Sequence, residues 1–224
     1  MNSIDPRWPK VLSLSVHEFR TPMTVVAGYI RMLQKDRAGA LNDQQRRLLE
    51  EAEKSCARLS SLLVEVSDVS QLEDGTATFN KSQADLQVIL QETIAKLPTL
   101  ADRDVDVRLE TDGRPAPLLA DPVRLARALT SVVVALRREL IGDEALIVRQ
   151  QRSAERYEIL IGEAPTIAAL IGEPAESRGL FDEWRGGVGL SLMVARRVIE
   201  AHGGALYGAP EERKSGARIV LGSA

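Results

Sequence analysis

The sequence predicts an α+β protein of two parts: a hairpin of two long helices over residues 1–74, and an α/β sandwich over residues 75–224. Two observations carry this prediction. In the first third, apolar residues recur at alternating steps of three and four, which is typical of a helix with one apolar seam. In the remainder, segments with helical spacing of apolar residues are interspersed with short segments in which apolar and polar residues alternate, as in strands.

The helical hairpin is predicted from two seams separated by a break at residues 37–42. One hairpin cannot bury both seams, whereas two hairpins do so as a four-helix bundle. We therefore expect a homodimer, although an intramolecular partner would also serve. Cys56 is interpreted as a small core residue on the second seam. The seam residues are Leu12, Val16, Phe19, Met23, Val26, Ile30 and Leu33, and then Leu49, Ala52, Cys56, Leu59, Leu63 and Val66.

The second part begins after Gly75, which we expect to cap the second long helix. Helices packed on one face of a mixed sheet are predicted there. Gly203 and Gly204 are expected to stop the last helix. The predicted elements are a strand at 76–81, a helix at 85–97, a strand at 104–110, a helix at 121–140, paired strands at 145–151 and 156–161, a helix at 187–202, and closing strands at 205–208 and 217–221.

Composition and charge are ordinary for a soluble globular protein, with 44% hydrophobic and 27% charged residues. The net charge of −3 and the absence of a long basic block give no reason to expect nucleic acid as a partner. Cys56 is the single cysteine, which rules out an internal disulfide and fits a reducing compartment. Residues 1–10 lack a signal-peptide pattern, and no apolar run approaches the roughly 18 residues of a membrane span. We therefore expect a cytoplasmic protein.

The most informative segment is Ser15-Val16-His17-Glu18-Phe19-Arg20-Thr21-Pro22. His17 follows a seam residue, so its ring is expected at the edge of the bundle, within reach of another protein. Neutral imidazole is a good nucleophile, and Glu18 is placed to accept a proton from one ring nitrogen while the other attacks phosphorus. Thr21 shares the helix face of His17 and is suited to orienting a water. Pro22 removes one helical hydrogen bond, which predicts a local kink.

This segment resembles the H-box of bacterial sensor histidine kinases, and the likeness extends over the whole first third. The resemblance implies a HisKA-type dimerisation and phosphoacceptor domain, with His17 as the phosphoacceptor and a response-regulator receiver domain as the partner. The rest of the chain is similar, less evenly, to the GHKL-type ATPase domain of that family. The segments that carry this second likeness are 121–125, 180–184, 187–192 and 200–204.

The second resemblance also suggests nucleotide-binding residues. Gly187 and Gly189 would let phosphate approach the backbone at a helix N-terminus, although tight packing of a helix start explains them equally well. Arg138 matches a basic position that contacts phosphate in the family, and a solvated helix residue is the simpler interpretation. Glu163 lies one residue from the position of the aspartate that reads adenine.

Several departures speak against ATP and Mg²⁺, the cofactors that the resemblance implies. Methyl groups cannot coordinate a hard cation that needs oxygen ligands, so no metal ligand set is predicted. The loop before Gly187 is also reduced, since only Arg185 and Gly186 follow Trp184. We predict a degenerate ATPase domain with weak or absent autokinase activity. The departures are Ala135 and Ser131 where the family has asparagines, Gly162 where it has the aspartate, and Ala164 and Thr166 where it has glycines.

Three functions stay open from the sequence. In the first, His17 exchanges a phosphoryl group with a response-regulator aspartate or receives one from an upstream kinase, and Glu18 and Thr21 alternatively support dephosphorylation of the regulator. In the second, the chain is an active autokinase whose atypical nucleotide site uses Glu163 and the glycine segment. In the third, it is a non-catalytic module that docks a regulator or heterodimerises with a kinase. The retention of Glu18 and Thr21 argues against the third.

Overall fold

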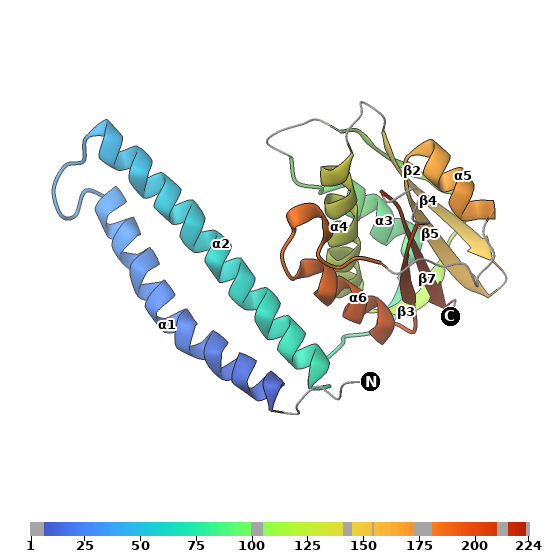
Figure 1. The fold of residues 1–224 in the computed structure, drawn as a ribbon, viewed down its shortest axis with the longest axis horizontal. Coiled ribbons are helices and arrows are strands. Elements are labelled where there is room, and N and C mark those ends of the chain that lie inside the picture. The colour runs from blue at the N-terminus through green and yellow to red at the C-terminus, as the bar shows by residue number, and fades with distance from the viewer. Residues whose placement is uncertain are drawn as a thin grey trace. The chain divides into compact units, whose positions relative to one another are not determined.

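The computed structural model describes residues 7–99, 105–140, 145–153, 155–172, 181–209 and 215–222. The chain divides into two compact units, Met1–Ala77 and Thr78–Ala224. The first is a helical hairpin and the second a mixed α/β domain, so the predicted fold class is confirmed (Figure 1). Within the described ranges, no helix is long and apolar enough to cross a membrane. Asp104 and Leu180, which belong to predicted segments, lie outside those ranges.

The hairpin consists of α1 (Trp8–Gln34) and α2 (Asp43–Glu73), which run side by side (Figure 1). Their facing sides bury Val16, Ile30 and Cys56, and the predicted core position of Cys56 is therefore confirmed. Three other seam residues remain open to solvent in the single chain, since Phe19 is 60%, Val26 46% and Leu59 48% exposed. The seam is thus only partly covered by the hairpin itself.

The open end of the hairpin is tied by one buried hydroxyl. Ser70, in the last turn of α2, is 3% exposed and donates a 2.7 Å hydrogen bond from Oγ to the carbonyl oxygen of Pro9. Gly75 follows the helix with a φ of +69°, the left-handed conformation expected at a helix C-terminus. The bond fixes the start of α1 against the end of α2.

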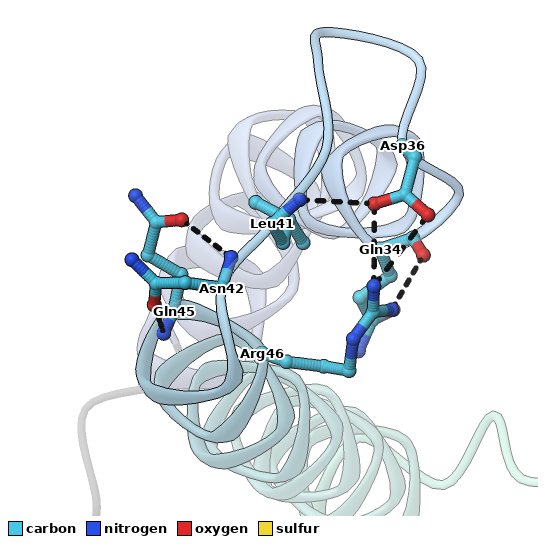
Figure 2. A network of polar contacts seen from close by, with 6 residues as sticks. All are labelled: Gln34, Asp36, Leu41, Asn42, Gln45 and Arg46. Carbon is cyan, nitrogen blue, oxygen red and sulfur yellow. Dashed lines mark hydrogen bonds and ion pairs between the residues drawn. The ribbon is translucent and has the colours of Figure 1, made fainter.

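The closed end is held by a polar network around Asp36 (Figure 2). Asp36 has a φ of +55°, which is unusual for a residue with a side chain. Its carboxylate accepts from the backbone N–H of Leu41 at 3.3 Å and from Nη2 of Arg46 at 3.3 Å. Arg46 also donates from Nη1 to the carbonyl oxygen of Gln34 at 3.5 Å. The start of α2 thereby fixes the loop that leaves α1.

Arg46→Ala is expected to lower the free energy of unfolding of the full chain by about 1 kcal/mol, because a half-exposed ion pair and a bond to a helix-end carbonyl are lost together. Urea unfolding followed by circular dichroism measures this change. Arg47→Ala is the matched control, since Arg47 is exposed on the same helix and should change stability by less than about 0.5 kcal/mol. Equal effects of the two substitutions would contradict a specific role for the network.

The second unit contains a five-stranded sheet in the order β2-β4-β5-β7-β6 and a two-stranded sheet of β1 and β3. β2 and β4 are parallel, and the other neighbours are antiparallel. The prediction of a strand at 76–81 was wrong, because the strand begins at Ser82, where the chain first pairs with β3. The bounds are β1 Ser82–Asp85, β2 Val107–Glu110, β3 Pro117–Ala120, β4 Leu146–Ser153, β5 Arg156–Gly162, β6 Ala205–Gly208 and β7 Ala217–Gly222.

Helices cover both faces of the five-stranded sheet (Figure 1). α3 (Leu86–Ala95), α4 (Pro122–Glu139) and α6 (Ser191–Ala201) lie on one side, and α5 (Ala164–Gly172) packs Ile167 and Leu170 against Leu160 on the other. The expectation that helices cover a single face was therefore wrong, because α5 was not predicted. The helix expected from residue 187 begins at Ser191, since Gly187 and Gly189 have φ values of +58° and +69°.

His202 ends α6 and connects it to α4. Its Nδ1 lies 2.7 Å from the carbonyl oxygen of Val198, and its Nε2 accepts the backbone N–H of Asp121 at 2.9 Å. The ring must therefore be neutral with its proton on Nδ1. Burial lowers the pKa of His202 below 6.5, nearby Lys81 lowers it further, and the bond to Val198 opposes the shift.

Stability is expected to fall as the pH drops from about 6.5 towards the lowered pKa of His202. In this window the unfolded chain binds a proton at His202 more readily than the folded chain does. Above the window His202 is neutral in both states, so its effect on stability does not change with pH. The pKa of Asp121 is also lowered, so that group acts only below 3.8. Urea unfolding between pH 7.5 and pH 5 tests this, with His202→Gln as the variant. A variant that loses stability as steeply as the native chain would refute the assignment.

Candidate functional site

His17 stands at the rim of the hairpin. It follows Val16, which is 4% exposed, and its own side chain is 77% exposed. Nδ1 lies 3.4 Å from Oε1 of Glu18, whose side chain is also exposed. Nε2 has no hydrogen-bond partner in the part of the chain that the structure describes. The ring can therefore share its Nδ1 proton with a carboxylate while the lone pair of Nε2 faces solvent.

Thr21 and Pro22 complete this stretch of α1. Thr21 is exposed, four residues after His17. The helix continues through Pro22 without interruption, although Pro22 has no N–H for the carbonyl of Glu18. The predicted kink therefore does not break the helix. The arrangement presents an imidazole, a carboxylate and a hydroxyl on the exposed side of one helix.

In the second unit, the glycine segment lies directly on α4. Gly186 has a φ of +67°, and a Cβ added to it would lie 2.6 Å from Cα and 2.8 Å from Cβ of Ala135. Ala135 is fully buried. Only a glycine can approach α4 this closely, so the backbone of Gly186 covers the position at which the resemblance would place a metal-binding asparagine.

Two arginines hold this segment in place. Arg138 donates from Nη1 to the carbonyl oxygens of Gly187 at 3.0 Å and Gly186 at 3.4 Å. Arg185 donates from Nε to both carboxylate oxygens of Glu139 at 3.0 Å, and a further close contact joins its Nη2 to Oε2. We call the segment Arg185–Gly187, with Arg138 and Glu139, the α4 clamp.

The clamp brings some of the predicted nucleotide-binding residues together and leaves others apart. Arg138 contacts Gly187, but its Nη1 donates to peptide carbonyls of the segment. Glu163 forms no hydrogen bond or ion pair with Arg138, Gly187 or Gly189 among the described residues. A groove of about 620 Å³ between α3 and α4 is lined by none of these four. Sequence reasoning missed Glu139 as the partner of Arg185, and no motif pointed to it.

The side chain of Thr166, four residues after the end of β5, fills the space beside Gly162 and Gly216. Thr166 is 4% exposed, and its Cγ2 lies where a Cβ on Gly162 would come within 2.9 Å and one on Gly216 within 2.4 Å. The family's aspartate position, Gly162, therefore has no room for a carboxylate. A side chain at position 162 and the side chain of Thr166 would compete for the same space.

Residues 10–75 match the family described as the His Kinase A (phospho-acceptor) domain. The chain is 28% identical over 200 residues to the sensor protein GacS of Pseudomonas syringae pv. syringae, an alignment that covers 84% of this chain and 22% of GacS. It is 26% identical over 207 residues to the circadian input-output histidine kinase CikA of Synechococcus elongatus, covering 86% of this chain and 27% of CikA. The chain thus spans about a quarter of the length of these relatives.

Solved structures share the fold. Full-length ShkA in complex with AMPPNP superposes with a TM-score of 0.74 at 20% identity, over 96% of this chain and 46% of ShkA. The histidine kinase AdeS of Acinetobacter baumannii gives 0.59 at 18% identity, over 93% of this chain and 97% of AdeS. The family match therefore identifies residues 10–75, around His17, as a His Kinase A (phospho-acceptor) domain, and the similarity to the solved structures shows the fold of the chain.

Proposed function

We propose that the chain is a histidine phosphotransfer protein. His17 accepts a phosphoryl group from the aspartate of a response-regulator receiver domain, or from an upstream kinase, and passes it on. Residues 1–74 carry this exchange, and residues 75–224 form a degenerate ATPase-type domain with weak or absent autokinase activity. The single observation that carries the proposal is an accessible His17 beside Glu18 in a chain whose glycine segment is clamped onto α4.

The geometry of His17 supports the transfer chemistry. Nε2 attacks the phosphorus of the aspartyl phosphate, the N–P bond forms as the O–P bond breaks, and the aspartate leaves as a carboxylate. The Nδ1 proton is held by Glu18, which offsets the positive charge that develops on the ring. The reverse step regenerates neutral imidazole. No nucleotide takes part in either direction.

The α4 clamp supports the loss of ATP use. Phosphoryl transfer from ATP depends on Mg²⁺ and on basic groups that neutralise the transferred phosphoryl. Ala135 offers no oxygen ligand, and Arg138 is engaged by the carbonyls of Gly186 and Gly187. An incoming triphosphate would have to displace the segment and break the ion pair of Arg185 with Glu139.

Dimerisation through the hairpin forms part of the proposal. Phe19, Val26 and Leu59 lie on the two seams and remain exposed in the single chain. A second hairpin that covers them would leave His17 at the rim of a four-helix bundle, open to a receiver domain. Sedimentation equilibrium of the full chain measures the mass, and a monomer at micromolar concentration would contradict this part.

Two reactions test the proposal. Labelled phosphoryl groups on a panel of receiver domains are expected to appear on the chain and to leave the receivers. Radiolabelled ATP with Mg²⁺ or Mn²⁺ is expected to give little or no label. Strong ATP labelling of the native chain would favour the alternative, an autokinase with an atypical site. That alternative is supported by the left-handed glycines before α6.

Thr21→Ala is expected to slow hydrolysis of a phosphorylated receiver, seen as release of inorganic phosphate, by about 10²-fold, because the hydroxyl that positions the water is lost. Transfer of label to His17 should persist. Thr24→Ala is the matched control, since that hydroxyl is engaged with the carbonyl oxygen of Arg20 at 2.9 Å. Time courses of inorganic phosphate release provide the measurement. An unchanged rate in Thr21→Ala would exclude the role given to Thr21.

A further inference from the structure

Residues 79–81 lie at the start of the second unit, before β1, and are fastened to the end of α6. The ring of Phe79 packs edge-on against the ring of His202, with 5.5 Å between the two ring centroids. Nζ of Lys81 donates a 2.7 Å hydrogen bond to the carbonyl oxygen of Ala201. We call residues 79–81 the linker clasp.

Asp121 joins the remaining clasp residue, Asn80, to the same histidine ring. Its Oδ2 accepts the backbone N–H of Asn80 at 3.0 Å, and its own backbone N–H donates to Nε2 of His202 at 2.9 Å. Asp121 is 5% exposed and also caps α4, since Oδ1 accepts the backbone N–H of Arg124 at 3.0 Å. Movement of Asp121 away from His202 would therefore disturb the bond that holds Asn80.

The surroundings of His202 suit a neutral ring. The charged groups that act on it are Lys81 from the clasp, and Asp121 and Arg124 from the start of α4. The two cations already lie over the ring of Phe79, with Arg124 at 5.1 Å and Lys81 at 5.9 Å from its centroid. A proton on Nε2 would add a third cation to this cluster. It would also set a ring N–H against the backbone N–H of Asp121, so that bond would be lost.

The lowered pKa of His202 couples the clasp to acid. Burial is its largest cause, the bond to the carbonyl of Val198 opposes it, and Lys81 lowers the pKa further. Phe79 covers the ring and Lys81 repels its charge only while the clasp is docked, so release lets the pKa rise towards 6.5. The docked chain therefore binds the proton less readily than the released chain. Falling pH then favours release, whereas above about pH 6.5 the ring is neutral in both states.

We propose that the linker clasp is a pH-sensitive fastening of the chain that connects the two units: neutral His202 holds residues 79–81 on the second unit, and protonation of His202 releases them. Release lengthens, by the three clasp residues, the stretch between α2 and β1 that is not fixed to the second unit. The hairpin and the second unit are then free to move more independently in acid. His17 takes no part in this switch.

Amide exchange and ring titration, both followed by NMR on the full chain, test the proposal. Between pH 7.5 and pH 5, the protection of the Asn80 amide, corrected for the intrinsic pH dependence of exchange, should fall by about fivefold or more, which corresponds to one lost hydrogen bond. The midpoint of this fall should coincide with the titration of the His202 ring. Ile159, fully buried in β5, provides the control amide, which should keep its protection.

His202→Gln removes the titrating ring and should abolish the pH step at Asn80, whatever the level of protection in that variant. His17→Ala should keep the step, which separates the clasp from the phosphotransfer function. The proposal is overturned by a step that persists in His202→Gln, or by a His202 ring that titrates while Asn80 stays protected. A ring that stays neutral throughout this range, or a joint loss of protection at Asn80 and Ile159, overturns it too.

Discussion

His17→Ala is expected to reduce phosphoryl exchange with receiver domains by about 10³-fold or more, because the only exposed imidazole of α1 is the nucleophile. The chain has two histidines, and His202 is engaged through both ring nitrogens. Loss of label in His17→Ala and its retention in His202→Gln would therefore assign the phosphorylated residue. The measurement is the radiolabel retained on each chain after electrophoresis under alkaline conditions. Loss of that label in acid identifies it as phosphohistidine.

The same substitution should leave the fold intact. His17 is exposed and its one polar contact is the 3.4 Å approach to Glu18, so the free energy of unfolding is expected to change by less than about 0.5 kcal/mol. Glu18→Gln is a second variant, which keeps the nucleophile and removes the proton acceptor. Exchange that survives in a folded His17→Ala chain would remove the basis of the proposed function.

Ala135→Asn is expected to lower the free energy of unfolding by about 3 kcal/mol and to restore no metal binding. The new amide would be buried and would meet the backbone of Gly186, which combines overpacking with desolvation of a polar group. Urea unfolding measures the loss, and calorimetry with ATP and Mg²⁺ tests for binding.

Ser131→Asn is the matched control for that experiment. Ser131 is the other family asparagine position on α4, is not buried, and uses its hydroxyl on the carbonyl oxygen of Arg127. Asparagine there should change stability by less than about 0.5 kcal/mol. If Ala135→Asn instead folds normally and binds nucleotide with Mg²⁺, the α4 clamp does not block the site and the autokinase alternative gains support.

The hairpin and the position of His17 were readable from the sequence, because heptad spacing and helical phase depend on local order alone. Phe19 and Val26 show the limit of that reading. Periodicity placed both on the seam, but a single chain does not contain what would cover them. The pattern describes a surface that needs a partner, and it does not identify that partner.

The proposed degeneracy of the second unit was less readable, because it depends on contacts between distant segments. The sequence shows that Ala135 and Gly162 have no side-chain oxygen. It does not show what fills the space around them: Gly186 on Ala135 joins residues 51 positions apart in the sequence, and Thr166 fills space beside both Gly162 and Gly216. The helix α5 was missed because its first residues were compared with a glycine motif of the family and no helix was assigned to them.

The hydroxyl of Ser70 on the carbonyl oxygen of Pro9 has a mechanical consequence. Because this bond joins the first turn of α1 to the last turn of α2, rotation or sliding of one helix against the other at that end would break it, at a net cost of about 1 kcal/mol. The bond therefore couples small movements of the two helix ends directly, across the width of one helix pair.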